Sequence, residues 1–293
     1  MVVQHNLSAM NSTRLLGVNQ SSLSKNLEKL SSGYSINRAG DNAAGLAISE
    51  KMRSQIAGLN QASTNSQDGI SMVQTFEGAL QETDAILQRM KTLATQSANG
   101  TYDEDVDRAA IELEYQQLCD EIDDISKTDF NGVVVLSTSA VATGGNLNVV
   151  SSVKLQAGAR TNDLQEFTFA YSSAGLGGLD ANLNCTSAGL GLNSLSLGTQ
   201  MSANAAIDKI DNALNKVSMV RATFGSIQNR LEHKIANLDV SAENMQASES
   251  RIRDTDMAKE MMSFTKNQIL SQASQAMLAQ ANSLPQGVLS LLQ

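Results

Sequence analysis

The sequence predicts a mainly α-helical protein: a long antiparallel, coiled-coil-like helical rod with paired terminal helices and a small β-hairpin and loop region in the middle of the chain. Three observations support this. Apolar residues recur at three- and four-residue steps on both sides of the middle. Only 3% of the 293 residues are aromatic, which favours a thin aliphatic core. Ser, Gly, Ala and Asn dominate residues 137–200 and separate the two helical halves.

The first helix is predicted over residues 5–32, where leucines recur every seven residues from Leu16, with Leu27 extending the same stripe. It is interrupted in "LSSGYSINRAGDNAAG" by Gly33 and Gly40 and by a cluster of Asn and Asp. Glycine costs about 1 kcal/mol in a helix interior, and Asn and Asp favour caps and turns. We therefore expect a joint or hinge between two helices here.

A second helix is predicted from 44 to 98, because apolar residues keep heptad steps along it until Asn99 and Gly100. A third follows at about 104–127. The dipeptide Asn131-Gly132 then predicts a turn before a β-prone run of valines.

Two further strands are expected in "LNVVSSVKLQAG" and "LQEFTFAYS", forming a hairpin or small sheet. The glycine-rich residues 174–198 read as an irregular surface loop. Heptad steps return at about 203, and a final helix is predicted over about 255–284. The two long halves match in length, so an antiparallel arrangement follows, with both termini at the same end.

Composition and charge argue against several classes of function. The net charge is −9 and no basic stripe appears, which disfavours nucleic-acid binding. No run of about 18 apolar residues exists, so membrane insertion is not expected. The chain start lacks the basic leader and apolar run of a secretory signal peptide, so export would need another route. Only 17% of residues are charged, which suits a surface covered by neighbouring subunits as well as an ordinary solvated one.

No constellation of residues predicts catalysis, a cofactor or a metal. His5 and His233 belong to no ligand cluster, and the acidic run "LCDEIDDIS" is typical of a solvated helix face. Cys119 is expected to be a small, partly buried apolar residue. Cys185 lies in the glycine-rich stretch and is expected to be an incidental thiol. We therefore expect a protein that is not an enzyme, with no cofactor and no metal.

The carboxyl end carries more information, because its leucines and valine would be sticky if left in solution. These residues are expected to pack in a partner or an assembly: Val288, Leu289, Leu291 and Leu292. The same argument applies to the amino end, since Leu15, Leu16, Val18 and Leu23 also need cover.

Two long stretches carry a family resemblance. "LEKLSSGYSINRAGDNAAGLAISEKMRSQIAGLNQASTNSQDGISMVQTFEGALQETDAILQRMKTLATQSANGT" resembles the amino-terminal core of bacterial flagellins, and "ESRIRDTDMAKEMMSFTKNQILSQASQAMLAQANSLPQGVLSLLQ" is similar to their carboxyl-terminal core. The likeness covers about residues 1–136 and 200–293, and the short middle leaves no room for large outer domains.

The resemblance implies a division of the chain into named parts. These are an inner-core helix at 1–32, a spoke at 33–43 with Gly33 and Gly40 as its hinge, outer-rod helices at 44–130, a β-hairpin with variable loops at 131–200, an outer-rod helix at 201–250 and a second inner-core helix at 251–293.

The resemblance also implies an extracellular structural subunit that polymerises with itself into the hollow filament of the bacterial flagellum. It implies export in unfolded form through the flagellar type III channel. An export chaperone would cover the carboxyl-terminal helix beforehand, and cap and hook-junction proteins would contact the filament. A hook–filament junction protein stays an alternative class, as does an enzymatic flagellin, although no protease motif is present.

Host receptors are the last implication of the resemblance. The positions that match those read by the Toll-like receptor for flagellin are Arg89, Leu93 and Glu114. Nearby, Thr92 stands where the family often has an acidic residue and Leu118 where it often has a basic one. Inflammasome receptors of the NAIP family would read the apolar carboxyl end named above.

Overall fold

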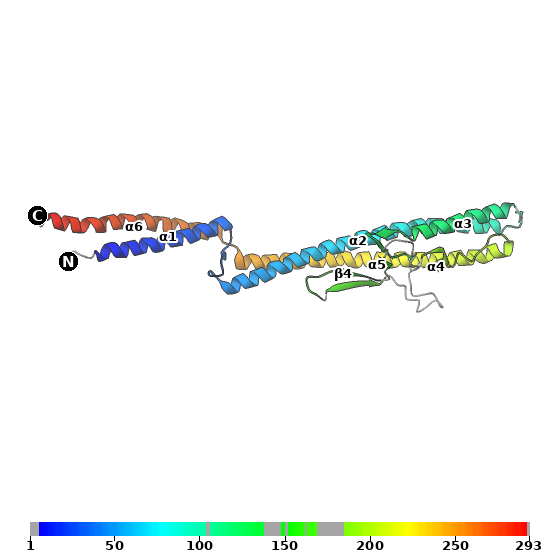
Figure 1. Cartoon of the computed structure of the whole chain (residues 1–293), viewed down its shortest axis with the longest axis horizontal. Coiled ribbons are helices and arrows are strands. Elements are labelled where there is room, and N and C mark those ends of the chain that lie inside the picture. The colour runs from blue at the N-terminus through cyan, green and yellow to red at the C-terminus, as the bar shows by residue number, and fades with distance from the viewer. Residues whose placement is uncertain are drawn as a thin grey trace. The chain divides into compact units, whose positions relative to one another are not determined.

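The computed structural model describes residues 6–103, 106–137, 148–149, 152–161, 163–168 and 185–291 (Figure 1). The chain divides into two compact units. One consists of Met1–Ile56 with Glu243–Gln293, and the other is Ala57–Ala242. Two helices, α2 (Ala43–Ser97) and α5 (Gln200–Arg253), contribute to both units.

The first unit is built on two antiparallel helices, α1 (Leu7–Ser32) and α6 (Met257–Leu291), which lie side by side in Figure 1. Asn6, the N-cap of α1, donates its side-chain N–H to the carbonyl of Ala281, toward the C-terminal end of α6, at 2.8 Å. The predicted pairing of terminal helices is therefore confirmed. Helix α5 continues to Arg253, so the chain leaves the helix three residues after the predicted boundary at 250.

Helix α6 runs through Pro285 to Leu291, beyond its predicted end near 284. Proline in a helix interior removes the hydrogen bond to the carbonyl four residues earlier, which here is that of Ala281. This carbonyl accepts the Asn6 side-chain amide instead. A partner from α1 thus satisfies the group that Pro285 leaves without its helical donor, and the helix continues.

The second unit is a bundle of α2, α5 and α3 (Asp107–Ile125). Helices α2 and α5 are antiparallel, since Lys91 pairs with Asp211 at 2.6 Å and Ser63 donates to Asp239 at 3.1 Å. The core uses few aromatic side chains, as the composition predicts. Its most buried members include Phe76, Leu80, Leu87, Met90, Tyr115, Ile122, Ala206, Ile210 and Phe224.

The predicted turn and hairpin are present in the second unit. Strand β1 (Asp129–Phe130) pairs antiparallel with β2 (Val133–Val134) around Asn131-Gly132. Both turn residues have positive φ, 52° and 80°, as a tight turn of this hand requires. Strand β3 (Asn148–Val149) adds to β2 in parallel.

A separate hairpin pairs β4 (Ser152–Gln156) with β5 (Leu164–Thr168). It lies against α2, because Asn65 donates to the carbonyl of Gln156 at 3.1 Å. A Cβ on Gly58 would lie 2.9 Å from the Cβ of Ala159, so glycine permits this close approach.

The described part of the loop predicted over 174–198, residues 185–198, is largely irregular as expected, but the prediction that it lies on the surface is wrong. This segment forms a short helix, α4 (Ser187–Leu190), and buries Cys185, Leu190 and Leu192 in the core. The segment has many glycines, and its few apolar residues are too closely spaced to show a helical or strand period, so the sequence did not predict that they are buried. Residues 174–184 lie outside the described part of the chain.

The terminal helix pair and its joint as the candidate functional site

The terminal helix pair, α1 with α6, leaves large apolar side chains on its outside. Along its whole length α1 has no buried residue. Eleven large apolar side chains on the pair are between 40% and 69% exposed: Leu7, Met10, Leu15, Val18, Leu27, Met257, Met261, Met262, Ile269, Leu270 and Met277. Leu27, which was predicted to extend the leucine stripe, is one of them and does not face α6.

The seam between the two helices is unusually polar for a helix pair. Its half-buried and buried residues follow heptad spacing: Asn6, Ala9, Ser12, Leu16, Asn19, Leu23, Asn26 and Leu30 on α1, and Glu260, Phe264, Asn267, Ser271, Ser274, Leu278 and Ala281 on α6. Leucine and asparagine alternate along α1 from Leu16. Polar residues at seam positions lower stability but fix the register of the two helices.

Side-chain amides connect the helices along this seam. Asn19 donates to the hydroxyl of Ser274 at 3.1 Å. The amide of Asn26, in the orientation that satisfies both its atoms, donates to Glu260 and accepts from Asn267, each at 3.1 Å. Together with Asn6, these asparagines hold one antiparallel register, while most of the large apolar surface faces away from the seam.

The joint between α1 and α2 begins at Gly33. This residue caps α1 with φ 76° and donates its N–H to the carbonyl of Lys29 at 2.9 Å. The left-handed conformation costs a residue with a Cβ about 1–2 kcal/mol. Gly40 lies in a turn, has no positive φ and has open space around its Cα. Only the first of the two predicted hinge glycines therefore needs to be glycine.

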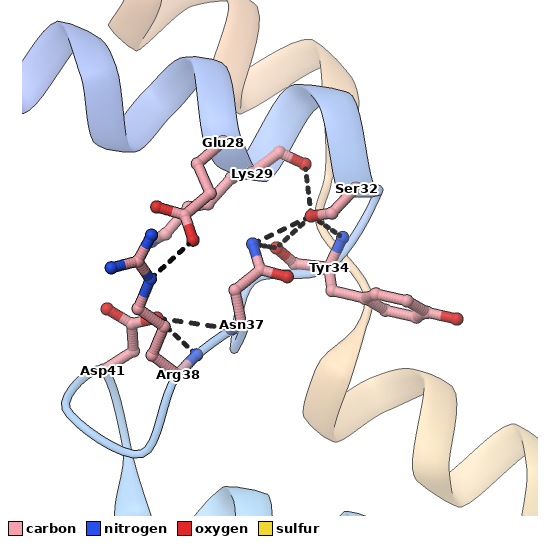
Figure 2. Close-up of polar contacts among 7 residues, drawn as sticks. All are labelled: Glu28, Lys29, Ser32, Tyr34, Asn37, Arg38 and Asp41. Carbon is pink, nitrogen blue, oxygen red and sulfur yellow. Dashed lines mark hydrogen bonds and ion pairs between the residues drawn. The ribbon is translucent and has the colours of Figure 1, made fainter.

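A polar network fixes the rest of the joint (Figure 2). The carboxylate of Asp41 accepts the backbone N–H groups of Asn37 at 3.3 Å and Arg38 at 3.1 Å. These two donors lower the pKa of Asp41, Arg38 first. The side chain of Arg38 reaches back to Glu28 on α1 at 2.9 Å. The Asn and Asp cluster thus acts as predicted, in caps and turns.

The same network ties the joint to the end of α1. Asn37 donates to the hydroxyl of Ser32 at 2.8 Å, and that hydroxyl in turn accepts the N–H of Tyr34 at 3.1 Å (Figure 2). On the far side of the turn, the side chain of Asn42 accepts the N–H of Gly45 at 2.9 Å and caps α2. Side chains of Ser32 and Asn42 therefore accept backbone N–H groups on both sides of the joint.

The joint runs antiparallel to the short connection between α5 and α6. Ser35 donates its N–H to the carbonyl of Arg253 at 2.6 Å, and Thr255 donates to the carbonyl of Gly33 at 2.9 Å. The guanidinium of Arg253 stacks 4.7 Å from the centre of the Tyr34 ring and pairs with Glu50 at 2.6 Å. Arg253 thereby joins both connections to the start of α2 and lowers the pKa of Glu50.

Replacing Gly33 by alanine is expected to loosen the joint. The added Cβ opposes the left-handed conformation by about 1–2 kcal/mol, which corresponds to amide exchange about 5–30 times faster in residues 30–36 of the full chain. Gly40→Ala is the matched control and should leave these rates within about twofold. Equal protection of the two variants would show that the cap does not hold the joint.

The predicted receptor-contact residues lie in the second unit. Arg89 on α2 and Glu114 on α3 are exposed and pair with each other, at 2.7 Å between Nη2 and Oε1. Leu93 is only 2% exposed and belongs to the core of the bundle. The prediction that Leu93 presents its side chain to a partner together with Arg89 therefore does not fit this structure. The role of Arg89 and Glu114 stays a prediction.

The apolar carboxyl end is described only in part. Val288, Leu289 and Leu291 lie in α6 by their backbone, and their side chains lie outside the described part of the structure. Leu292 lies outside the described residues.

Both cysteines are buried and free. Burial raises the pKa of Cys119 to about 11 and that of Cys185 to about 12, so both stay protonated thiols at neutral pH. Cys119 is thus a small core residue, as predicted. Cys185, which was predicted to be an incidental thiol in the glycine-rich stretch, is buried in the core of the second unit.

Helix α3 also contains two structural residues that sequence reasoning missed. The carboxylate of Asp123, predicted to be solvated, accepts the N–H and hydroxyl of Ser187 at 2.6 and 2.8 Å. Arg108 is buried and donates to the carbonyls of Ser97 and Asn99 at the end of α2, at 3.1 and 3.2 Å. Arg108 lies eleven residues after Ser97, the last residue of α2, and its spacing in the sequence does not predict this contact.

A paired set of terminal helices with a polar seam and an apolar outside defines a structural subunit of an assembly. Comparison with known proteins gives the family. Residues 3–140 match the bacterial flagellin N-terminal helical region, and residues 207–292 match the bacterial flagellin C-terminal helical region. The chain belongs to the bacterial flagellin family.

Relatives that match over their full length support the same family. The chain is 52% identical to a flagellin of Halalkalibacterium halodurans and 50% identical to a flagellin of Bacillus subtilis, with all of both chains covered in each case. It is also 48% identical to flagellin FlaB2 of Treponema pallidum over the whole of both chains.

One solved structure shows the same fold. A putative flagellar hook-associated protein from Vibrio parahaemolyticus superposes with a TM-score of 0.57 at 13% identity, over 73% of this chain and all of the other. The crystal structure of Bacillus cereus flagellin aligns at 35% identity and a TM-score of 0.47, over 64% of this chain and 94% of the other.

Flagellins are structural proteins of the extracellular flagellar filament, and they assemble with copies of themselves. Among the described residues, no helix has the length and apolar character needed to cross a membrane.

Proposed function

We propose that this flagellin polymerises by burying the outward apolar side chains of its terminal helix pair against neighbouring copies. In this proposal α1 and α6 are the inner core, residues 33–43 are the spoke, and the helices of the second unit are the outer rod. The observation that carries the proposal is the row of eleven exposed large apolar side chains on α1 and α6.

The magnitudes are consistent with assembly. Fully burying a large aliphatic side chain contributes about 1.5–3 kcal/mol, and association costs about 4–15 kcal/mol in lost translational and rotational freedom. These side chains are already partly buried, so covering all of their remaining exposed area gives a stabilisation of the same order as that cost. The asparagines, serines and glutamate of the seam reduce its apolar content, so in this proposal burial against neighbouring copies adds to the stability of the pair.

Charged substitutions on the outside of the pair test this surface. Val18→Asp with Ile269→Asp should abolish filament formation, because each carboxylate would be buried without a partner. The matched control is Gln20→Asp with Gln268→Asp, which adds the same charges at exposed polar positions of the same helices. Sedimentation and electron microscopy under polymerising conditions measure the result. Filaments from both double variants in equal yield would exclude the proposed surface.

Export and assembly partners are proposed to use the same surface. An unfolded chain passing through the type III channel would present these apolar segments, and a chaperone covering α6 would keep them from associating early. Cap and hook-junction proteins would contact the same helices at the filament ends. If the Ile269→Asp monomer bound the export chaperone with unchanged affinity, Ile269 would lie outside the chaperone's contact.

Recognition by the Toll-like receptor is proposed to involve Arg89 and Glu114. Both side chains are about half exposed, and an arginine has five donors, so Arg89 can pair with a receptor carboxylate while keeping Glu114. The NAIP-family receptors are proposed to read Val288, Leu289, Leu291 and Leu292 at the carboxyl end.

Arg89→Ala should weaken binding of the depolymerised monomer to the Toll-like receptor by about 1–3 kcal/mol, the loss of a charge-assisted hydrogen bond. Arg53→Ala is the matched control, since Arg53 is an equally exposed arginine of α2 that also pairs with a glutamate, Glu50. Surface plasmon resonance measures affinity, and helicity should not change. Impaired polymerisation with unchanged receptor affinity would instead assign Arg89 to a subunit interface.

A further inference from the structure

Methionine is unusually frequent on the outside of the terminal helix pair. Five of its eleven exposed large apolar side chains are methionines, and they are 48–67% exposed: Met10, Met257, Met261, Met262 and Met277. Met72 and Met90, by contrast, are buried in the core of the second unit. The methionine side chains of the pair are thus about half or more exposed in the free subunit.

Four of these methionines lie on α6, and Met10 lies on α1. Met257 and Met261 are four residues apart and share one face of α6, with Met262 beside them. Nearer the other end of α6, Met10 lines a groove between α1 and α6 with Ala9, Thr13 and Leu278.

The accessible sulfur of the pair is therefore thioether sulfur. The two thiols of the chain are buried and stay protonated, which protects them from oxidation. Methionine oxidation depends on exposure rather than on ionisation, so these methionines are the sites that an oxidant reaches on this surface.

We propose that the exposed methionines of α1 and α6 are an oxidation site, and that peroxides acting on the free subunit block its addition to the filament. The proposal rests on the assembly of copies through the terminal pair. In the reaction a sulfur lone pair attacks one peroxide oxygen, the O–O bond breaks and a sulfoxide forms. The leaving hydroxide takes a proton and departs as water, so sulfur is oxidised by two electrons and hydrogen peroxide is reduced.

The consequence follows from the change in polarity. A sulfoxide is a strong hydrogen-bond acceptor, and burying it in an apolar interface without a donor is costly. A methionine that suits a contact between copies becomes a group that opposes it. Once copies cover the surface, the sulfurs are out of reach, so the free subunit is sensitive and the filament is protected.

The experiment compares free and assembled protein. Full-length monomer and preformed filaments receive equal doses of hydrogen peroxide, and mass spectrometry maps the oxidation of each methionine. In the monomer, we expect the five methionines of the pair to be oxidised at least about tenfold faster than Met72 and Met90. In filaments, their oxidation should fall several-fold. Oxidised monomer should lose most of its polymerisation yield in a sedimentation assay.

Variants and enzymatic reversal make the result specific. A variant with leucine at all five positions should polymerise and should keep its yield after peroxide. The control Met201→Leu with Met219→Leu removes two exposed methionines of the second unit and should stay as sensitive as the natural chain. Methionine sulfoxide reductases A and B with dithiothreitol should restore assembly of the oxidised natural protein, a test that does not depend on how well the leucine variant assembles.

The proposal is overturned if oxidised monomer polymerises in normal yield, or if the reductases restore the methionines and not the assembly. It is also overturned if the leucine variant assembles and remains peroxide-sensitive. Normal filaments from Val18→Asp with Ile269→Asp would contradict assembly through the pair itself. The charged double variant is tested without any oxidant, so failure of the assembly proposal can be distinguished from failure of the oxidation proposal.

Discussion

A chain lacking residues 1–40 and 254–293 is expected to remain a folded helical monomer and to form no filaments. The core of the second unit lies within residues 57–242 and includes no residue of the deleted segments. The deletion removes α1 and α6 with all of their exposed apolar side chains. The expected effect is complete loss of assembly with little change in the stability of what remains.

Circular dichroism and analytical ultracentrifugation of the truncated chain measure helicity and oligomeric state. Its main thermal unfolding midpoint should match that of the full-length monomer within a few degrees, because the bundle core is intact. Normal-length filaments from the truncated protein would show that the second unit alone carries the assembly contacts.

Helices and their breaks could be predicted from the sequence because their signals are local. Heptad steps mark α2 and α5, and the Asn131-Gly132 dipeptide marks a turn whose conformation few other residues adopt. The interruption at Gly33 was equally local, since a left-handed cap needs glycine. The family resemblance, carried by both ends of the chain, supplied the function.

The seam of the terminal pair could not be predicted, because it depends on which faces meet. The leucines from Leu16 to Leu30 predict an apolar seam. Whether Asn19 and Asn26 face a partner or solvent depends on the position of α6. The persistence of α6 through Pro285 depends on the same pairing, since the compensating donor, Asn6, is 279 residues away in sequence.

Leu93 and Asp123 were placed on the correct helices, but their side chains were wrongly predicted to face a partner or solvent. Arg89 and Leu93 are four apart on α2, yet only Arg89 lies at the edge of the bundle. Asp123 belongs to an acidic run, yet a segment more than sixty residues later in the sequence places Ser187 against it. One sequence cannot position such distant segments.

Leu192→Ala is expected to destabilise the second unit by about 2–5 kcal/mol, the usual range for removing a buried leucine side chain. Leu192 is fully buried in the core beside α3, and its carbonyl accepts the hydroxyl of Tyr115 at 3.2 Å. The neighbouring segment is held by further contacts: Cys185 donates its N–H to the carbonyl of Leu136, and Leu197 donates to the carboxylate of Glu112.

The matched control is Asn193→Ala, the next residue, whose side chain is exposed and whose removal should change stability by no more than about 0.5 kcal/mol. Urea unfolding of the full-length monomer, followed by helicity, gives both values. A surface loop would tolerate either substitution equally, so equal urea midpoints would restore the loop interpretation of residues 185–198. A lower midpoint for Leu192→Ala alone would mean that this segment is a structural part of the bundle, because a cavity forms only where neighbouring side chains surround the deleted atoms.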